Sequence, residues 1–323
     1  MRGVGSPFVA ALAAAVGFGL GLASAPVGAA AQQLGDPDFV PRVESPAFAP
    51  GAGPLIALDE GHVNFHTIEG RFGTFAQLVR ADGYRIEPLR EAFSAQSLSG
   101  IDLLVIANAL HPRNDGDWSR PTPSAFTTDE IEAVREWVEA GGALLLIADH
   151  MPFPGAAHEL AAAFGFELNN GFAMFPGEPR GTMIFQKSRG LLADHAITDG
   201  SMGVGAIDSI ANFHGEAFVS PATATDLLVL PDGVVSLMTE VAWQFEDHTP
   251  VVPVGGWSQG SVLEVGEGRI AVFGEAAMFT AQRSGEERIP MGMNAPEASQ
   301  NPAFVTALVR WLTAAPRASG EGG

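Results

Sequence analysis

The chain has 323 residues, enough to bury a full hydrophobic core, and 46% of them are hydrophobic, which is typical of globular rather than disordered proteins. Its 37 acidic and 17 basic residues give a formal net charge of -20, so its surface repels phosphate backbones and nucleic acid is not an expected partner. It contains no cysteine, which excludes disulfides, thiolate zinc sites and cysteine nucleophiles.

The first 31 residues have the order of a secretory signal peptide. Arg2 supplies a positive start, residues 8–22 form an Ala-rich apolar core, and the small residues 29–31 provide a cleavage site. A membrane anchor is the competing interpretation, but the core is short and rich in glycine, and no other apolar run approaches ~18 residues. We therefore expect a secreted or periplasmic protein with no stable membrane insertion after signal cleavage.

Residues 32–53 are rich in Pro, Ala and Gly without helical or alternating periodicity, and we expect an extended linker there. One domain is expected over 54–314, followed by a disordered tail over 315–323. In its first half, strands predicted at 54–58, 84–89, 101–107 and 143–148 alternate with helices predicted at 74–81, 127–139 and 158–164. Continuous apolar strands between helices predict an α/β fold, a sandwich with a mostly parallel sheet buried on both faces.

The second half of the domain has a different pattern. Residues 226–230 and 234–238 flank Pro231-Asp232-Gly233, and residues 261–265 and 269–273 flank Gly266-Glu267-Gly268, which predicts two β-hairpins. We expect both hairpins to add antiparallel strands to the same sheet. The irregular segment 168–215 is expected to be an insertion or a lid, and 301–312 has the spacing of a closing amphipathic helix.

Polar side chains follow four of the predicted strands at their carboxyl ends, where open α/β sheets bind their ligands. The residues assigned to ligand binding are Asp59, Glu60, Asn64 and Asn108. The residues assigned to acid and base chemistry are Asp149, His150 and Glu275. One polar strand end carries little information, but the convergence of four predicts a single site for a small polar ligand.

His62 and His66 are four residues apart, a spacing that places two imidazoles on one face of a helical turn. With a nearby carboxylate they would hold a divalent metal, and the cofactor is otherwise unknown. The alternative, in which both are hydrogen-bonded loop side chains, stays open because the pair lacks the metalloprotease motif. No nucleophile elbow, phosphate-binding loop or dinucleotide fingerprint follows any predicted strand.

Several segments, taken in order, resemble the class I glutamine amidotransferase-like superfamily, and within it an uncharacterised, often exported branch near trehalose-utilisation-like domains. They are Asp59-Glu60-Gly61-His62 with Asn64-Phe65-His66, then 103–108, 141–150, 194–200 and 266–275, with 301–312 similar to the closing helix of that branch. The resemblance covers about 54–314 and implies a flavodoxin-like three-layer sandwich.

The amidotransferases carry a Cys nucleophile at a sharp turn after a central strand, and segment order places that turn at Asp149-His150. A carboxylate stands where the thiol would be, so glutamine hydrolysis by the Cys-His-Glu route is excluded. Sugar-related roles follow from the trehalose-utilisation-like relatives only by analogy of fold.

Two functions from different classes fit these residues. The first is a non-catalytic domain that holds a small polar ligand in the crevice, with carbohydrate as the class that the resemblance suggests. The second is a metal-dependent or acid/base hydrolase that uses the His and carboxylate cluster. The cluster favours the hydrolase, and the missing nucleophile favours the binding domain. We expect the same residues to line the site in either case.

Overall fold

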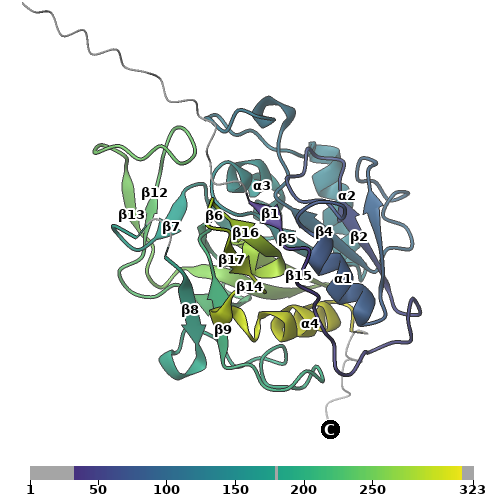
Figure 1. Ribbon diagram of the computed structural model, residues 1–323. Coiled ribbons are helices and arrows are strands. Elements are labelled where there is room, and N and C mark those ends of the chain that lie inside the picture. Colours follow the sequence, from purple (N-terminus) through teal and green to yellow (C-terminus); the bar gives the residue numbers. More distant parts are fainter. Residues whose placement is uncertain (1–32, 179–180, 315–323) are drawn as a thin grey trace, which may run out of the picture.

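The computed structural model describes residues 33–178 and 181–314 (Figure 1). The expected signal peptide and C-terminal tail lie outside the described residues, and both stay predictions. Within the described part of the chain, no helix is long and apolar enough to span a membrane.

The domain is a mixed α/β structure built on a central, mostly parallel sheet (Figure 1). Among the described residues, its nine strands are β2 (Leu55–Asp59), β3 (Arg85–Leu89), β4 (Leu103–Ala107), β5 (Ala143–Ile147), β6 (Glu167–Asn169), β10 (Ala217–Val219), β11 (Thr225–Val229), β14 (Ser258–Val265) and β15 (Gly268–Phe273). The order is β3-β2-β4-β5-β15-β14-β10-β6, and β11 also pairs with β14. Strands β3, β2, β4, β5 and β15 run parallel, whereas the others pair antiparallel. The parallel sheet predicted from the apolar runs is confirmed.

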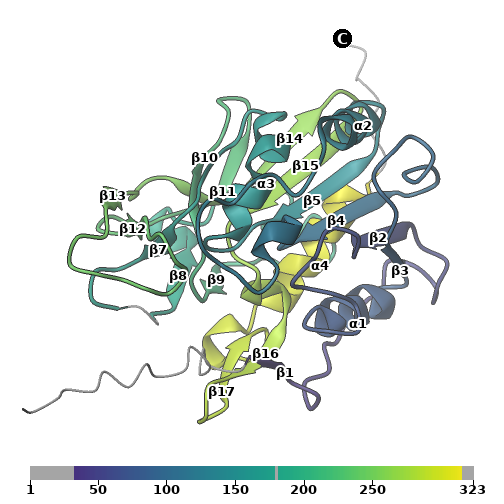
Figure 2. The ribbon, with the colours of Figure 1, turned by 90° about the horizontal axis from the view of Figure 1, so that it is seen from above.

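Helices cover the central sheet on both faces (Figure 2). Helices α1 (Gly73–Ala81) and α4 (Asn301–Leu312) pack on one face, and α2 (Thr128–Glu139) and α3 (Phe153–Ala162) pack on the other. Every residue of β5 is buried, and successive side chains alternate between the two cores, so that Leu145 joins the first and Leu144 the second. Each buried leucine contributes about 1.5–3 kcal/mol. This two-sided burial explains the unbroken apolar runs in the sequence.

The start of α2 shows how local sequence fixes an element. Thr127 is its N-cap, and its hydroxyl oxygen accepts from the backbone N–H of Glu130, 3.3 Å away. The Glu130 carboxylate accepts in return from the backbone N–H of Thr127 at 2.9 Å. Thr127 and Glu130 therefore form a reciprocal capping box at the start of the helix predicted from residue 127. The same Glu130 carboxylate also reaches a histidine of the candidate site.

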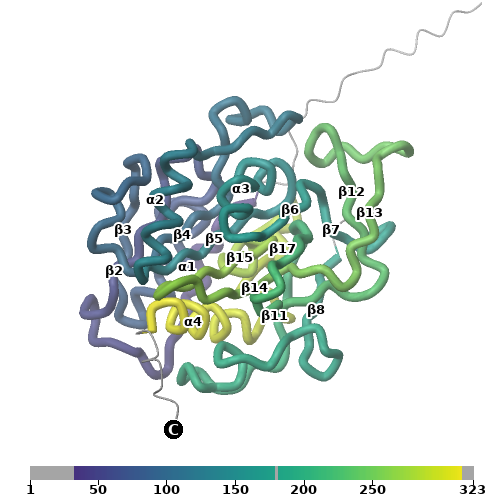
Figure 3. Tube along the Cα trace, turned by 180° about the vertical axis from the view of Figure 1, so that it is seen from behind, coloured from purple at the N-terminus to yellow at the C-terminus, as the bar shows by residue number. Residues whose placement is uncertain are grey.

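Besides the central sheet, the described residues form three smaller sheets and four short helical turns. The sheets are β13 (Val251–Pro253) with β12 (Val235–Leu237) and β7 (Phe172–Met174), β8 (Met183–Gln186) with β9 (Ser209–Asn212), and β1 (Leu34–Gly35) with β16 (Ala281–Ser284) and β17 (Ile289–Gly292). Figure 3 shows β7, β12 and β13 to one side of the central strands β4, β5 and β15. The turns are η1 (Pro112–Asn114), η2 (Lys187–Arg189), η3 (Ala277–Phe279) and η4 (Pro296–Ala298). Segment 168–215 thus contributes strands to several sheets and is not a single lid.

One of the two expected hairpins is wrong. Strands β14 and β15 form the hairpin predicted around residues 266–268. In contrast, β11 pairs with β14, while β12 pairs with β13 and β7 in a separate sheet. The turn at Pro231-Asp232-Gly233 is present, but Leu227 and Leu228 are buried in the main core, and this burial draws β11 to the central sheet. A turn signal alone does not choose the partner of a strand.

The extended lead-in before residue 54 is docked on the domain. Strand β1 pairs with β16, and Asp36, which is 6% exposed, pairs with Arg283 at 2.9 Å. Further along, the guanidinium of Arg310 on α4 binds both carboxylate oxygens of Asp82 and the carbonyl of Ser45. The lead-in, the end of α1 and α4 are therefore tied together by one arginine.

We predict that Arg310→Met lowers the free energy of unfolding by about 3–5 kcal/mol, because it leaves the buried Asp82 carboxylate without its charged partner. Urea denaturation of the variant and wild type measures this loss. Arg135→Met is the matched control, since Arg135 pairs with Glu139 in a largely exposed i, i+4 pair and its loss should cost less than about 0.5 kcal/mol. Equal effects of the two substitutions would contradict the assignment.

Candidate functional site

Three carboxylic acids meet at the carboxyl edge of the central sheet. Asp149 follows β5, Glu275 follows β15, and Glu216 immediately precedes β10. Glu275 and Glu216 are buried, with 1% and 0% exposure, and Asp149 is partly exposed. The negative charge of Asp149 acts on both glutamates. Asp149 is therefore the member of this carboxyl cluster that a ligand can reach from solvent.

Backbone hydrogen bonds hold Asp149 in place. Asn108, at the end of β4, has a left-handed φ of 52°, and its side-chain oxygen accepts from the backbone N–H of Asp149 at 2.9 Å. The Asp149 carboxylate in turn accepts from the backbone N–H of His150 at 2.7 Å. Asn108 is 1% exposed, so it acts as a positioning residue for Asp149 and not as a surface ligand group.

A close approach of two backbones places Glu216 beside Glu275. The backbone N–H of Glu216 donates to the Gly274 carbonyl at 2.7 Å. Gly215 has φ +114°, and a Cβ added to it would lie 2.0 Å from that same carbonyl oxygen, so only glycine fits there. The glycine before each glutamate thus allows the start of β10 to meet the end of β15.

Both buried glutamates favour their protonated forms. Burial raises the pKa of Glu275 well above its usual range and the charge of Asp149 raises it further, although the N–H groups of Met278 and Ala277 donate to its carboxylate at 2.8 and 2.7 Å and partly oppose the shift. Burial likewise raises the pKa of Glu216, again with a contribution from Asp149, and neither Glu216 oxygen makes a hydrogen bond of good geometry in the described part of the chain. The two buried glutamates therefore bind their protons more tightly than an exposed carboxyl group does.

Aromatic side chains pack around His150, the residue next to Asp149. The ring of His150 stacks on Phe172 at 4.5 Å between centroids and meets the edge of Trp243 at 4.6 Å. Its Nδ1 lies 2.7 Å from the Met151 carbonyl, which assigns the proton to Nδ1 and leaves Nε2 as an acceptor. Trp243 is 39% exposed and has a left-handed φ of 65°. Backbone strain at a bulky, exposed ring is typical of ligand-binding positions.

His66 lies at the same edge but is enclosed by aromatic rings. It is 2% exposed, and its ring centroid lies 4.7 Å from Phe72 and 5.3 Å from Phe65. Burial lowers the pKa of His66 to about 3, helped by the positive charge of Arg71. His66 is therefore neutral at physiological pH, and its Nδ1 has no hydrogen-bond partner among the described residues.

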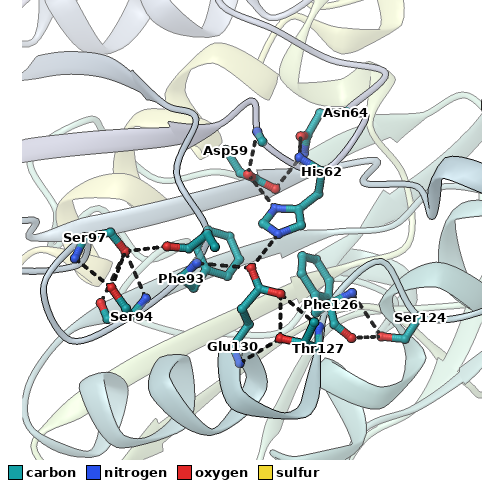
Figure 4. A network of polar contacts seen from close by, with 12 residues as sticks. Asp59, His62, Asn64, Phe93, Ser94, Ser97, Ser124, Phe126, Thr127 and Glu130 are labelled. Atoms are coloured by element: carbon teal, nitrogen blue, oxygen red, sulfur yellow. Dashed lines mark hydrogen bonds and ion pairs between the residues drawn. The ribbon is translucent and has the colours of Figure 1, made fainter.

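His62 belongs to a separate buried network (Figure 4). Its Nδ1 lies 2.9 Å from Asp59, its Nε2 lies 3.0 Å from Glu130, and the ring packs between Phe93 and Phe126 (Figure 4). Burial lowers the pKa of His62, but hydrogen bonds and charge attraction from Asp59 and Glu130 outweigh it and raise the pKa overall. This network joins the end of β2 to the start of α2.

The expected helical turn carrying His62 and His66 is wrong, because residues 60–67 are in neither helix nor strand. Both ring nitrogens of His62 are engaged by carboxylates of the protein, and His66 contacts different rings. Within residues 33–178 and 181–314, no group of three or more His, Asp or Glu side chains is arranged to hold a metal ion. The structure does not bring the predicted metal pair together.

The predicted ligand-binding residues after β2 are also engaged internally. The Asp59 carboxylate accepts from the Asn64 side chain at 2.8 Å as well as from His62. Glu60 accepts from the backbone N–H of Ile68 at 2.9 Å and pairs with Arg90 at 2.8 Å. These side chains shape the loop between β2 and α1, whereas Asn108, Asp149, His150 and Glu275 are brought together as expected.

Sequence reasoning missed Glu216 and the tryptophans of the site. Glu216 follows a glycine directly before an apolar run, but nothing local shows that β10 starts where β15 ends. Trp243 lies in the loop between β12 and β13, and Trp118, whose ring is 6.1 Å from His150, lies in another loop after η1. An exposed tryptophan in a loop was the one available signal.

A concave region lies at the opposite edge of the sheet. A surface cavity of about 600 Å³ is lined by His195, Asp199, Thr225, Glu264 and Trp311, among others. Glu264 pairs with Arg269 near the start of β15, which places this cavity at the amino ends of the parallel strands. It shares no residue with the carboxyl cluster. We assign the functional site to the carboxyl edge, because the polar groups with shifted pKa values converge there.

The chain matches no protein-family model and no curated protein. Among solved structures, the mmIFT52 N-terminal domain is similar, with a TM-score of 0.55 and 14% identity over 83% of this chain and 99% of that one. A putative ThuA-like protein from Bacteroides uniformis ATCC 8492 aligns with a TM-score of 0.44 and 13% identity over 87% and 97% of the two chains. Cytoplasmic protein STM1381 from Salmonella typhimurium LT2 aligns with a TM-score of 0.47 and 12% identity over 81% and 99%. At 14% identity, the similarity to the mmIFT52 N-terminal domain shows a shared fold and nothing about function.

We predict that His62 makes stability fall as pH rises. Its folded pKa is raised, so its contribution is fully present below its unfolded pKa of about 6.5 and is lost as pH rises through the folded value. Relative to His62→Gln, which does not titrate, the wild type should lose about 1.5–3 kcal/mol of unfolding free energy over that window. Urea titrations at several pH values measure it, with exposed His158 replaced by Gln as the control. A constant difference between wild type and His62→Gln would contradict this.

We predict that Glu216 also makes the stability of the protein fall as pH rises, over a lower pH range than His62. Its raised pKa means that the wild type loses stability as pH rises above the unfolded value of about 4.3. Glu216→Gln lacks this loss, so it should gain about 1–3 kcal/mol relative to the wild type between pH 4 and pH 8. Thermal or urea unfolding at both pH values checks this, with exposed Glu167→Gln as control. If the relative stability of Glu216→Gln does not change with pH, Glu216 is ionised in the folded protein.

Proposed function

We propose that this protein binds a small polar ligand, with carbohydrate as the leading class, in the crevice at the carboxyl edge of the central sheet. The observation that carries the proposal is the pairing of a partly exposed carboxylate, Asp149, with the exposed ring of Trp243 beside His150. Sugars offer hydroxyl groups to carboxylates and apolar ring faces to tryptophan, so this pairing suits them.

The placement of the buried acids supports binding over catalysis. A general acid must lie within hydrogen-bond reach of the group that it protonates. Glu216 and Glu275 are 0% and 1% exposed, and Glu275 is held by backbone N–H groups, so neither contacts a ligand in this conformation. Asp149 alone of the three reaches solvent. One accessible carboxylate is sufficient for binding, whereas hydrolysis through paired carboxylates needs two.

The proposal includes a family and a location. We infer a flavodoxin-like three-layer sandwich of the class I glutamine amidotransferase-like superfamily, in an exported branch near trehalose-utilisation-like domains. The mostly parallel sheet with helices on both faces, and Asp149 at the turn after the central strand β5, support that placement. The apolar segment before residue 31 supports secretion or a periplasmic location.

We predict that Asp149→Asn and Trp243→Ala each weaken ligand binding by about tenfold or more, since each removes a main contact. A thermal-shift screen of neutral and acidic sugars and sugar phosphates identifies the ligand, and isothermal titration calorimetry measures affinity. Glu246→Gln is a control on the same loop as Trp243, with an exposed side chain. Absence of any binding by the wild type, or unchanged affinity in both variants, would refute the proposed site.

An acid/base hydrolase is the second candidate, and the carboxyl cluster favours it. A glutamate with a raised pKa beside Asp149 is an acid and base pair of the kind that hydrolases use. This function requires a movement that exposes Glu275. Turnover of the ligand found by the screen, with loss of activity in Asp149→Asn, would establish it, and intact ligand after prolonged incubation would exclude it.

A further inference from the structure

Arg71 differs from the other partly buried arginines of the domain. It lies in the loop between β2 and α1, and in the described residues it makes no hydrogen bond and no ion pair. Its Nε is buried without a partner, and its guanidinium lies 4.0 Å from the ring centroid of Phe65. The other described arginines that are not exposed all have acceptors in the protein, and they are Arg120, Arg135, Arg269, Arg283 and Arg310.

An arginine without a partner is costly in this environment. Burial lowers the pKa of Arg71, which reports the loss of hydration around its charge. The chain carries 37 acidic residues, yet none of those that the structure describes lies within ion-pair distance of this guanidinium. Arg71 therefore has a planar set of donors available for an acceptor that comes from outside the protein.

Two neighbouring features fit the same kind of acceptor. Helix α1 begins at Gly73, its N-cap Phe72 provides no side-chain hydrogen bond, and its first turn contains no acidic residue. A helix amino terminus left uncapped carries partial positive charge and free N–H groups, and it favours an anion. His66 is 2% exposed, packs on Phe72 and has an unpartnered Nδ1, and it feels the charge of Arg71. The charge of Arg71, the unpartnered Nδ1 of His66 and the start of α1 thus belong to one region of the loop before α1.

The region around Arg71 and the start of α1 is linked by aromatic contacts to the proposed ligand crevice. Phe65, which carries Arg71 on its face, contacts the edge of Trp118 at 5.2 Å, and Trp118 lies 6.1 Å from His150. His150 in turn meets Trp243 at 4.6 Å. A row of aromatic rings, in which Phe65 and Trp118 are partly exposed and His150 is buried, therefore joins Arg71 to the surroundings of Asp149.

We propose that Arg71 and the first turn of α1 bind an oxyanion group, a carboxylate or a phosphate, of the ligand that occupies the crevice. This inference rests on the proposed function and narrows its ligand class to acidic sugars, sugar phosphates or similar anionic polar molecules. A protein with a net charge of -20 repels such ligands at long range, so a local cation is required to hold them. Asp149 then receives hydroxyl donors at the other end.

The test measures binding of simple anions to the full-length protein by calorimetry at constant ionic strength in chloride. The probes are inorganic phosphate and acetate, which distinguish a phosphate site from a carboxylate site. We expect the wild type to bind at least one of them, and Arg71→Gln to weaken that binding by about tenfold or more, because a charge-assisted hydrogen-bond pair is lost. Arg71→Lys keeps the positive charge but loses the planar set of guanidinium donors, so it should retain part of the affinity for the anion.

Arg135→Gln is the matched control, since it makes the same change of charge on α2 and should alter anion affinity by less than about twofold. Melting temperatures verify folding, and Arg71→Gln should melt within a few degrees of the wild type, because it loses only the cation–π contact with Phe65. Failure of the wild type to bind either anion, or equal anion binding by Arg71→Gln and wild type, would overturn the proposal.

The outcome is distinguishable from that of the proposed function. If Asp149→Asn and Trp243→Ala abolish binding of a ligand while Arg71→Gln leaves it and anion binding unchanged, the crevice stands and the oxyanion site is refuted. If phosphate or acetate binding depends on Arg71 but no larger polar ligand binds, the oxyanion site is supported. The proposed binding of a polar ligand in the crevice is then refuted.

Discussion

The register of β5 with its two parallel neighbours determines where the polar groups of this protein meet. Ile147, the last residue of β5, lies opposite Ala107 of β4 on one side and Phe273 of β15 on the other. All three strands are fully buried, so every backbone N–H and C=O group in them must be paired, and a slip in register would leave some unpaired. Asn108 consequently lies one residue beyond this level, and Asp149 and Glu275 both lie two residues beyond it.

The acids at this edge are expensive to bury, and the protein offsets the cost in different ways. Glu275 receives backbone N–H groups at the start of η3, and Asp149 is held by Asn108 and by its neighbour's backbone. Neither Glu216 oxygen has a hydrogen-bond partner among the described residues, and burial raises the pKa of Glu216 well above its usual range. Buried carboxyl groups such as Glu216 cost stability, and a neutral residue in their place would stabilise the fold. Such groups are typical of functional sites, where the chemistry of the site outweighs its cost to stability.

The two conspicuous histidines after β2 show how one motif can hold two physical roles. His62 is charged more readily than a free histidine, because it lies between two carboxylates, and it links β2 to α2. His66 is held neutral by aromatic burial and by the positive charge of Arg71. The loop between them places Phe65 in the row of rings that separates Arg71 from Asp149. The region is thus electrostatically divided, with a cation at one end and acids at the other.

The sequence by itself determined the elements whose signals are local. The apolar runs of β2, β4, β5 and β15, the capping box of Thr127 and Glu130, and the amphipathic spacing of α4 each reflect interactions within a few residues or burial on both faces of a sheet. Because parallel strands end at a common edge, the convergence of Asn108, Asp149, His150 and Glu275 also followed from the sequence.

Only the tertiary structure decided which partner each polar or apolar group takes. It paired β11 with β14 rather than β12, and it brought Glu216 beside Glu275 through the contact of Gly215 with Gly274. It gave His62 two carboxylate partners from distant elements and left Arg71 with none. These outcomes depend on contacts between residues far apart in the chain, and local periodicity carries no information about such contacts.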